Sequence, residues 1–263
     1  MSAAPHLLQA RGLSVTRRGK TILQDVSIGF PATGSVAIIG PNGAGKSTLL
    51  ALLAGLEKPG AGEVLLGTQR VTDVPAAARA QSIGFMPQHF EPHWDLGLEE
   101  LLGMRLTPPR GQGTPGWPSV EEVITRHQLG AFRGRRWSTL SGGEQARVLL
   151  ATVLATDPPI LLADEPGAAL DVRHRLTLVE ALAQRGQTRL VIVAMHDLDL
   201  AFRHFDRIVV VTDGRIAIDG GEELIHAALL DESFGVVFDR IGVPPGVVLR
   251  ARLRPQAVDG SGP

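Results

Sequence analysis

The chain has 263 residues, of which 44% are hydrophobic, and it contains no cysteine. This length suits one large domain or two small ones with a substantial core, and the lack of cysteine excludes disulfides, thiol catalysis and cysteine-ligated zinc. The formal net charge is −1, so the basic excess typical of sequence-independent nucleic-acid binding is missing and we expect no nucleic-acid partner.

Neither membrane insertion nor secretion is predicted. No stretch approaches about eighteen uncharged apolar residues, the length that a membrane-spanning helix needs. The N-terminal residues lack the basic region and apolar run of a secretory signal. We therefore expect a cytoplasmic protein.

The N-terminal region is predicted to form two antiparallel strands. Residues 7–15 lead up to a turn at 18–20, and residues 22–30 lead back. Apolar residues alternate along 26–30, as in a strand with one buried face.

A glycine-rich loop follows an apolar run at 36–39 and precedes a predicted helix at 48–54. The loop fits G-x-x-x-x-G-K-[ST], the phosphate-binding P-loop. Its glycines let successive N–H groups surround anionic oxygens, and the helix N-terminus adds partial positive charge. We expect Lys46 to reach the β- and γ-phosphates and Ser47 to bind Mg²⁺. The expected nucleotide-binding residues are Gly40, Pro41, Asn42, Gly43, Ala44, Gly45, Lys46, Ser47 and Thr48.

The middle of the chain begins with short β-structure and then becomes helical. A loop rich in proline and glycine interrupts the helical part. The expected elements are a strand at 63–67, a helical turn at 75–80, a strand at 82–86, helices at 98–105 and 120–127, a surface loop at 107–118 and a helix at 141–155.

Strands and helices alternate in the C-terminal half. The strands are nearly continuous apolar runs, which predicts a parallel sheet covered on both faces. The expected elements are strands at 160–163, 190–195, 207–211 and 216–218, a hairpin turn at 212–215, helices at 172–184, 198–204 and 221–235, a β-like extension at 236–254 and a frayed tail at 259–263.

Two acids follow the apolar strand at 160–163, namely Asp164 and Glu165. Parallel sheets bind ligands at the carboxyl ends of their strands. We expect Asp164 to hold Mg²⁺ and Glu165 to polarise the water that attacks the γ-phosphate. Acids at strand ends are also common as solvated caps, but the P-loop upstream favours the catalytic interpretation.

The segment Leu140-Ser141-Gly142-Gly143-Glu144 begins the predicted helix at 141–155. Ser141 and Glu144 fit a capping box. That box does not explain two glycines in the first turn, each unfavourable by about 1 kcal/mol relative to alanine. Their bare N–H groups form a second anion site. The segment resembles the signature motif of ATP-binding cassette (ABC) ATPases. As in that family, it lies between the P-loop and the strand at 160–163, which resembles the family's Walker B strand.

The resemblance covers roughly residues 7–235. It implies an α/β fold of the P-loop NTPase class, with a RecA-like, mostly parallel sheet core and an N-terminal antiparallel β subdomain. An α-helical subdomain would be inserted at about 89–157. The nucleotide-binding domain would span 1–235, and 236–263 would form a short C-terminal extension and tail.

The resemblance also implies a homodimer. Two copies would pair head to tail, so that each ATP lies between one P-loop and the partner's signature motif. The residues that would touch nucleotide across this interface are Ser141, Gly142, Gly143 and Asp171. Asp171 resembles the aspartate of the family's D-loop, although it also suits the N-cap of the helix from Val172.

Two further residues resemble family site residues. Gln88 is similar to the Q-loop glutamine, which touches Mg²⁺ and the attacking water and leads to the surface that meets a membrane partner. His196 is similar to the switch histidine that contacts the γ-phosphate. The implied catalytic residues are thus Glu165, His196, Gln88 and Lys46, and the implied Mg²⁺ ligands are Ser47, Gln88 and Asp164.

The chain departs from the family at two places. Arg17 stands where an aromatic residue usually stacks on adenine, and a guanidinium plane also stacks on a base. Gly167 and Ala168 replace the usual Thr-Ser, which removes two hydroxyls near the expected dimer interface.

The resemblance favours the ATPase subunit of an ABC importer. Segments 196–201 and 223–236 are similar to importers of the iron-siderophore, heme and cobalamin type. Separate membrane permease subunits and, indirectly, a substrate-binding protein would be partners, and the chain would lie at the cytoplasmic face of the membrane.

Three alternatives remain. The chain could serve an importer of another substrate class. It could be a soluble ABC ATPase of translation or DNA repair, but such proteins usually add a second cassette or a long coiled coil, and neither occurs between Thr48 and Leu140. It could bind nucleotide as a regulator without hydrolysing it. The presence of both Glu165 and His196 argues against this third alternative.

Overall fold

The computed structural model describes residues 6–107, 116–243 and 246–253. The interior of the predicted 107–118 loop, residues 244–245 and everything from residue 254, including the predicted tail, lie outside the described residues. No helix within the described ranges combines the length and the apolar character needed to cross a membrane.

The central sheet has six strands. They are β3 (Gly34–Ile39), β6 (Ile83–Met86), β7 (Ile160–Asp164), β8 (Leu190–Ala194), β9 (Arg207–Thr212) and β10 (Arg215–Gly220). Their order is β10-β9-β3-β8-β7-β6, and all neighbours run parallel except β10 with β9. Every residue of β7 and β8 is buried, because both faces of the sheet are covered. The predicted parallel sheet is confirmed.

A second, antiparallel sheet comes from the N-terminal region. Its strands are β1 (Leu8–Arg17), β2 (Lys20–Phe30), β4 (Ala61–Leu66) and β5 (Gln69–Arg70), in the order β2-β1-β4-β5. The predicted hairpin is confirmed, since Arg17 pairs with Lys20 beside the turn. The sequence analysis missed β5, because two exposed polar residues show no hydrophobic pattern.

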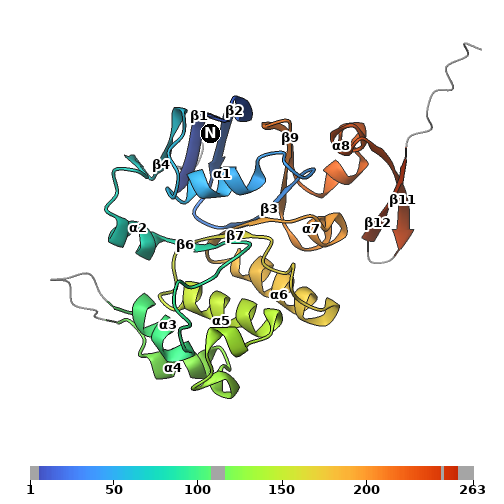
Figure 1. Cartoon of the computed structure of the whole chain (residues 1–263). Helices are drawn as coiled ribbons and strands as arrows, with labels where there is room; N and C mark the ends of the chain where they lie inside the picture. The colour runs from blue at the N-terminus through green and yellow to red at the C-terminus, as the bar shows by residue number, and fades with distance from the viewer. Residues whose placement is uncertain (1–5, 108–115, 244–245, 254–263) are drawn as a thin grey trace, which may run out of the picture.

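Helix α1 (Lys46–Leu53) lies between the two sheets (Figure 1). Apolar side chains of β1, β2, α1 and one face of the central sheet form one core, in which Leu49, Leu50, Leu52 and Leu53 are fully buried. The helix begins earlier than predicted, because Gly45 in the left-handed conformation turns the loop directly into it.

The other face of the central sheet is covered by helices, whose apolar side chains form a second core. The group α3, α4 and α5 lies below β6 and β7 in Figure 1. The helices outside α1 are α2 (Ala76–Ser82), α3 (Leu98–Arg105), α4 (Val120–Arg126), α5 (Gly142–Leu154), α6 (Val172–Arg185), α7 (Leu198–His204) and α8 (Ala228–Phe234). One predicted helix is divided, because Ala227 is extended between a 3₁₀ turn at Glu222–His226 and α8.

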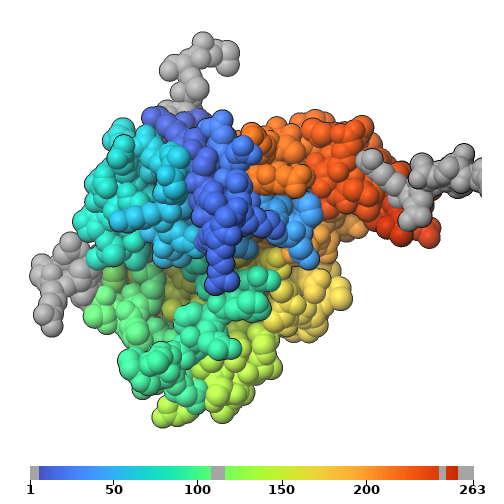
Figure 2. Space-filling view, turned by 45° about the horizontal axis from the view of Figure 1, so that its top comes forward, coloured from blue at the N-terminus to red at the C-terminus, as the bar shows by residue number. Residues whose placement is uncertain are grey.

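The C-terminal extension forms a hairpin of β11 (Val236–Val243) and β12 (Gly246–Leu253). It projects beside α8 in Figure 1, and Figure 2 shows these red residues at the edge of the molecule. Phe238 is buried against the second core, and the Leu249 N–H donates to Asp199 Oδ1 of α7 at 2.9 Å. A domain boundary at residue 235 stays a prediction.

Candidate functional site

The P-loop joins the end of β3 to the start of α1, and neighbouring strands constrain its path. Gly40 has a φ of 147°, and a Cβ there would lie 2.0 Å from the Val211 carbonyl oxygen. Gly45 has a φ of 106°, and a Cβ there would lie 2.7 Å from Leu23 Cδ2. Only glycine satisfies both the backbone conformation and the space at these two positions.

Lys46 is buried in the loop and is 5% exposed. Its Nζ donates to the carbonyl oxygens of Gly40 at 2.8 Å and Pro41 at 3.0 Å. Burial lowers the pKa of Lys46, and the carboxylates of Glu165 and Asp164 oppose that shift. The loop thus holds an amino group whose remaining donor capacity is available to an anion.

Asp164 ends β7 and is 5% exposed. Its Oδ1 is buried and has no hydrogen-bond partner. Burial raises the pKa of Asp164, and the Ser47 hydroxyl and Lys46 oppose this. An unpaired buried carboxylate oxygen next to a hydroxyl is a donor set that suits Mg²⁺, which prefers oxygen ligands.

Glu165 lies at the centre of a three-residue cluster from three strand ends. Its φ of 49° is unusual for a residue other than glycine, and its N–H donates to the Ala194 carbonyl oxygen at 2.9 Å. Its Oε2 accepts from Gln88 Nε2 at 3.0 Å, and its Oε1 lies 2.5 Å from His196 Nε2. The strained backbone therefore aims one carboxylate at both neighbours.

One cavity of about 620 Å³ contains most of the predicted site residues, a volume that suits a small ligand. Arg17 contributes to it from the end of β1. The cavity is lined by Arg17, Ile22, Asn42, Gly43, Gly45, Lys46, Ser47, Thr48, Gln88, Glu165 and His196.

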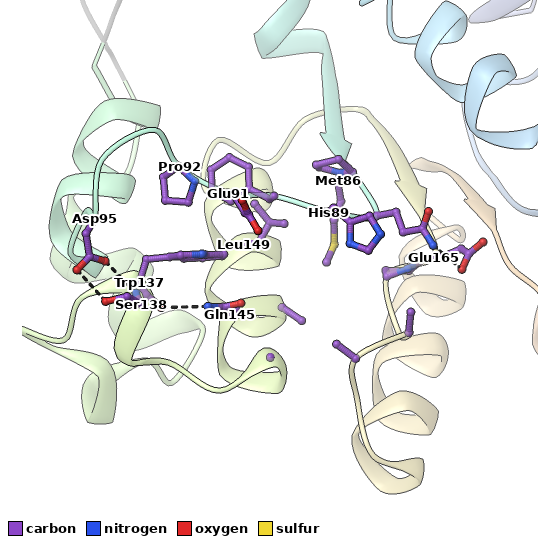
Figure 3. Close-up of a pocket in the computed structure, with 18 residues that line it drawn as sticks. Met86, His89, Glu91, Pro92, Asp95, Trp137, Ser138, Gln145, Leu149 and Glu165 are labelled. Carbon is purple, nitrogen blue, oxygen red and sulfur yellow. Dashed lines mark hydrogen bonds between the residues drawn. The ribbon is translucent and has the colours of Figure 1, made fainter.

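A second cavity of about 610 Å³ extends from Glu165 to α5 (Figure 3). At its far end Asp95 accepts from the Ser138 N–H at 2.9 Å and from its hydroxyl at 2.8 Å, and Gln145 donates to the Trp137 carbonyl oxygen at 3.0 Å. The sequence analysis gave no role to Asp95, Trp137 and Ser138, because none of them belongs to a local motif.

The predicted capping box at the start of α5 is present. The Ser141 N–H donates to Glu144 Oε2 at 2.8 Å, and Ser141 Oγ accepts from the Glu144 N–H at 3.4 Å. A forked ion pair with Arg135 lowers the pKa of Glu144 to about 2, together with the Ser141 N–H.

The residues at the start of α5 do not line the P-loop cavity of their own chain. Gly142 lines the second cavity, and neither it nor Ser141 or Gly143 is among the described residues that line the first. Asp171 is exposed and does not line the first cavity either. It serves as the N-cap of α6, where its side chain accepts from the His174 N–H at 2.9 Å. A nucleotide-binding role for these four residues stays a prediction.

A family model described as ABC transporter matches residues 23–168, which is more than half of the chain. The chain belongs to the ABC transporter family. It is an ABC ATPase cassette, and the α/β P-loop fold expected from the sequence is confirmed by solved cassettes. One of them, the dimeric post-hydrolysis state of the ATP-binding cassette MJ0796 bound to ADP and Pi, is 28% identical, with a TM-score of 0.72 over 82% of this chain and 98% of that chain.

Two curated relatives of the cassette are described as import ATP-binding proteins. The hemin import ATP-binding protein HmuV of Streptomyces coelicolor is 38% identical over 232 residues, which cover 87% of this chain and 83% of the relative. The cobalamin import ATP-binding protein BtuD of Halobacterium salinarum is 39% identical over 236 residues and 88% of this chain. The chain spans only 58% of that relative's length.

Arg17, which lines the first cavity, also makes a contact that the sequence analysis did not foresee. Arg17 forms an ion pair with Glu57, which follows α1. Both side chains are partly exposed, with 50% and 39% of their surface accessible. No sequence signal links residues so far apart, because only the packing of α1 against the N-terminal sheet brings them together.

Proposed function

We propose that this cassette is the ATP-hydrolysing subunit of an ABC importer, with heme, cobalamin or a ferric siderophore as the transported class of substrate. The observation that carries the ATPase part is the convergence of Lys46, Gln88, Glu165 and His196 on one cavity. The importer part rests on relatives described as hemin and cobalamin import ATP-binding proteins.

Each residue of the cavity takes a defined role in this proposal. The loop N–H groups and Lys46 hold the β- and γ-phosphates, while Ser47, Asp164 and Gln88 would hold Mg²⁺. When bound there, the ion would neutralise the charge that develops on the phosphate oxygens. Glu165 accepts the proton of the attacking water as general base. His196, fixed by Glu165 Oε1, contacts the γ-phosphate.

A second copy of the chain completes the site. Ser141, Gly142 and Gly143 form a helix N-terminus that does not line the chain's own P-loop cavity, which supports a role toward the nucleotide of a partner. The existence of a dimeric cassette structure with ADP and Pi supports this arrangement. ATP would hold the two copies together, and hydrolysis would release them.

The permease is proposed to dock beside the segment 88–105. Two large apolar side chains of this segment are exposed, with 68% of Trp94 and 64% of Met104 accessible, and Leu56, which follows α1, is 58% accessible. A mostly apolar cavity of about 500 Å³ lies beside the segment, and its lining includes Leu56, Phe85 and Phe90. Exposed apolar surface of this kind typically marks a protein contact. The cassette would then lie peripherally at the cytoplasmic face of the membrane, and a substrate-binding protein would contact only the permease.

Reconstitution with its permease tests the proposal. The cassette and a permease that co-purifies with it would be placed in proteoliposomes with each candidate substrate and its binding protein. We expect ATP-dependent uptake of heme, cobalamin or a ferric siderophore, and no uptake with Lys46→Ala. ATPase activity without uptake of any of the three would refute the substrate class, and the absence of ATPase activity would refute the function.

The Arg17→Ala variant tests the contact with the base. We expect the KM for ATP to rise roughly twofold to thirtyfold, because a stacked guanidinium contributes about 0.5–2 kcal/mol. Glu57→Gln should have a smaller effect in the same direction, since it only releases the guanidinium. Arg18→Ala is the matched control, because Arg18 is exposed and does not line the cavity. An unchanged KM in Arg17→Ala would remove the assignment.

A further inference from the structure

The segment 166–170 connects Glu165 to the start of α6 through two tight turns. The Ala168 N–H donates to the Glu165 carbonyl oxygen at 3.1 Å, and the Leu170 N–H donates to the Gly167 carbonyl oxygen at 3.1 Å. Glu165 itself has a φ of 49°, which is unusual for a residue other than glycine, so the chain turns sharply where this segment begins.

Arg175, one turn into α6, lies across this segment. Its Nε donates to the Gly167 carbonyl oxygen at 3.3 Å, and its Nη2 donates to the Leu170 carbonyl oxygen at 3.3 Å. Within the described part of the chain Arg175 forms no ion pair with a carboxylate, so its guanidinium is directed to backbone alone. A planar fork is suited to joining two carbonyl groups in this way.

The Arg175 side chain occupies the space that a side chain at position 167 would need. A Cβ added at Gly167 would lie 2.9 Å from Arg175 Cγ, which is closer than real Cβ contacts. Arg175 also borders a small cavity of about 120 Å³ together with Glu165 and His196. The arginine therefore lies directly behind the cluster that contains the proposed general base.

The opposite side of the segment touches the start of α5. A Cβ at Gly142 would lie 3.4 Å from Ala169 Cβ, and a Cβ at Gly143 would lie 3.4 Å from Leu170 Cδ2. The segment 166–170 is thus in contact with the proposed catalytic cluster at one end and with the glycines of the proposed partner site at the other.

We propose that Arg175 is a positioning residue, which holds the segment 166–170 and thereby keeps the Glu165 carboxylate in its hydrolytic geometry. The inference rests on the proposed ATPase function. It also accounts for the Gly167-Ala168 sequence, since the side-chain hydrogen bonds to the segment come from Arg175 of α6 instead of from hydroxyls within the segment.

Steady-state ATPase kinetics of the full chain test this inference. In Arg175→Gln we expect kcat to fall roughly tenfold, the effect of losing a hydrogen bond from a charged donor. The KM for ATP should stay within about twofold, because Arg175 does not line the P-loop cavity. Arg175→Lys should recover part of kcat, because an ammonium group reaches one carbonyl but does not span both. Arg173→Gln, an exposed arginine of the same helix, is the matched control and should match the wild type.

A double-mutant cycle separates positioning from general destabilisation. Gly167→Ala pushes Arg175 away, so it should lower kcat as Arg175→Gln does, and the double variant should be no slower than the slower single variant. Additive losses in the double variant, or a lowered unfolding midpoint of Arg175→Gln with unchanged kcat, would refute the inference. An inactive wild type would refute the proposed function itself, which distinguishes the two failures.

Discussion

The Lys46→Ala variant is expected to lose tight ATP binding and to hydrolyse ATP at least about a hundredfold more slowly than the wild type. Lys46 is the buried cation of the cavity, and removing one preorganised charged donor from an active site typically costs that much in rate. Calorimetric titration with ATP and Mg²⁺ measures the affinity, and phosphate release measures the rate.

The control for Lys46→Ala is Lys58→Ala, which removes an exposed lysine that does not line the cavity. Lys46 also donates to the Gly40 and Pro41 carbonyl oxygens, so its removal can lower the stability of the fold. The midpoint of thermal unfolding is therefore measured for each variant together with its ATP affinity. A folded Lys46→Ala protein with native affinity would contradict the assignment of the phosphate site.

The Glu165→Gln variant is expected to bind ATP with little change and to lose hydrolysis by a factor of roughly 10²–10⁴, the usual contribution of a general base. The amide retains the size of the side chain and accepts from Gln88, but it does not accept a proton from water. If the site is completed by a second copy, unhydrolysed ATP should also trap the dimer, which light scattering after gel filtration would detect.

Glu180→Gln provides the comparison, because Glu180 is an exposed carboxylate of α6. A native hydrolysis rate in Glu165→Gln would show that Glu165 is not the base. A Glu165→Gln protein that hydrolyses slowly but stays monomeric with ATP and Mg²⁺ would instead refute the shared site and leave the base assignment intact.

Several parts of the site were predictable because each depends on adjacent residues. The P-loop follows a strand and precedes a helix, and Asp164 ends a buried strand. The capping box of Ser141 and Glu144 is likewise a local pattern, and the structure contains it with both hydrogen bonds. Local hydrophobic periodicity and turn chemistry decide such features before any tertiary contact forms.

Other parts were not predictable, because they depend on side chains that are distant in the sequence. The Arg17–Glu57 pair requires α1 to pack against the N-terminal sheet. Arg175 could be placed on a helix from the pattern, but its reach to the Gly167 and Leu170 carbonyl oxygens depends on the strained turn after Glu165. From the sequence, Gly167 was therefore noted only as a position at which the hydroxyl usual in the family is missing.

The amino-acid sequence by itself determined the element types, the phosphate loop and the chemical nature of the candidate residues, since these follow from contiguous patterns. Only the tertiary structure decided which residues meet. The strand order places the ends of β6, β7 and β8 side by side, and this brings Gln88, Glu165 and His196 into contact. The same packing leaves Asp164 Oδ1 unpaired and keeps Ser141 out of the lining of the P-loop cavity. The physical reason is that such contacts arise from long-range packing of the sheet and its helices, which no short segment of sequence encodes.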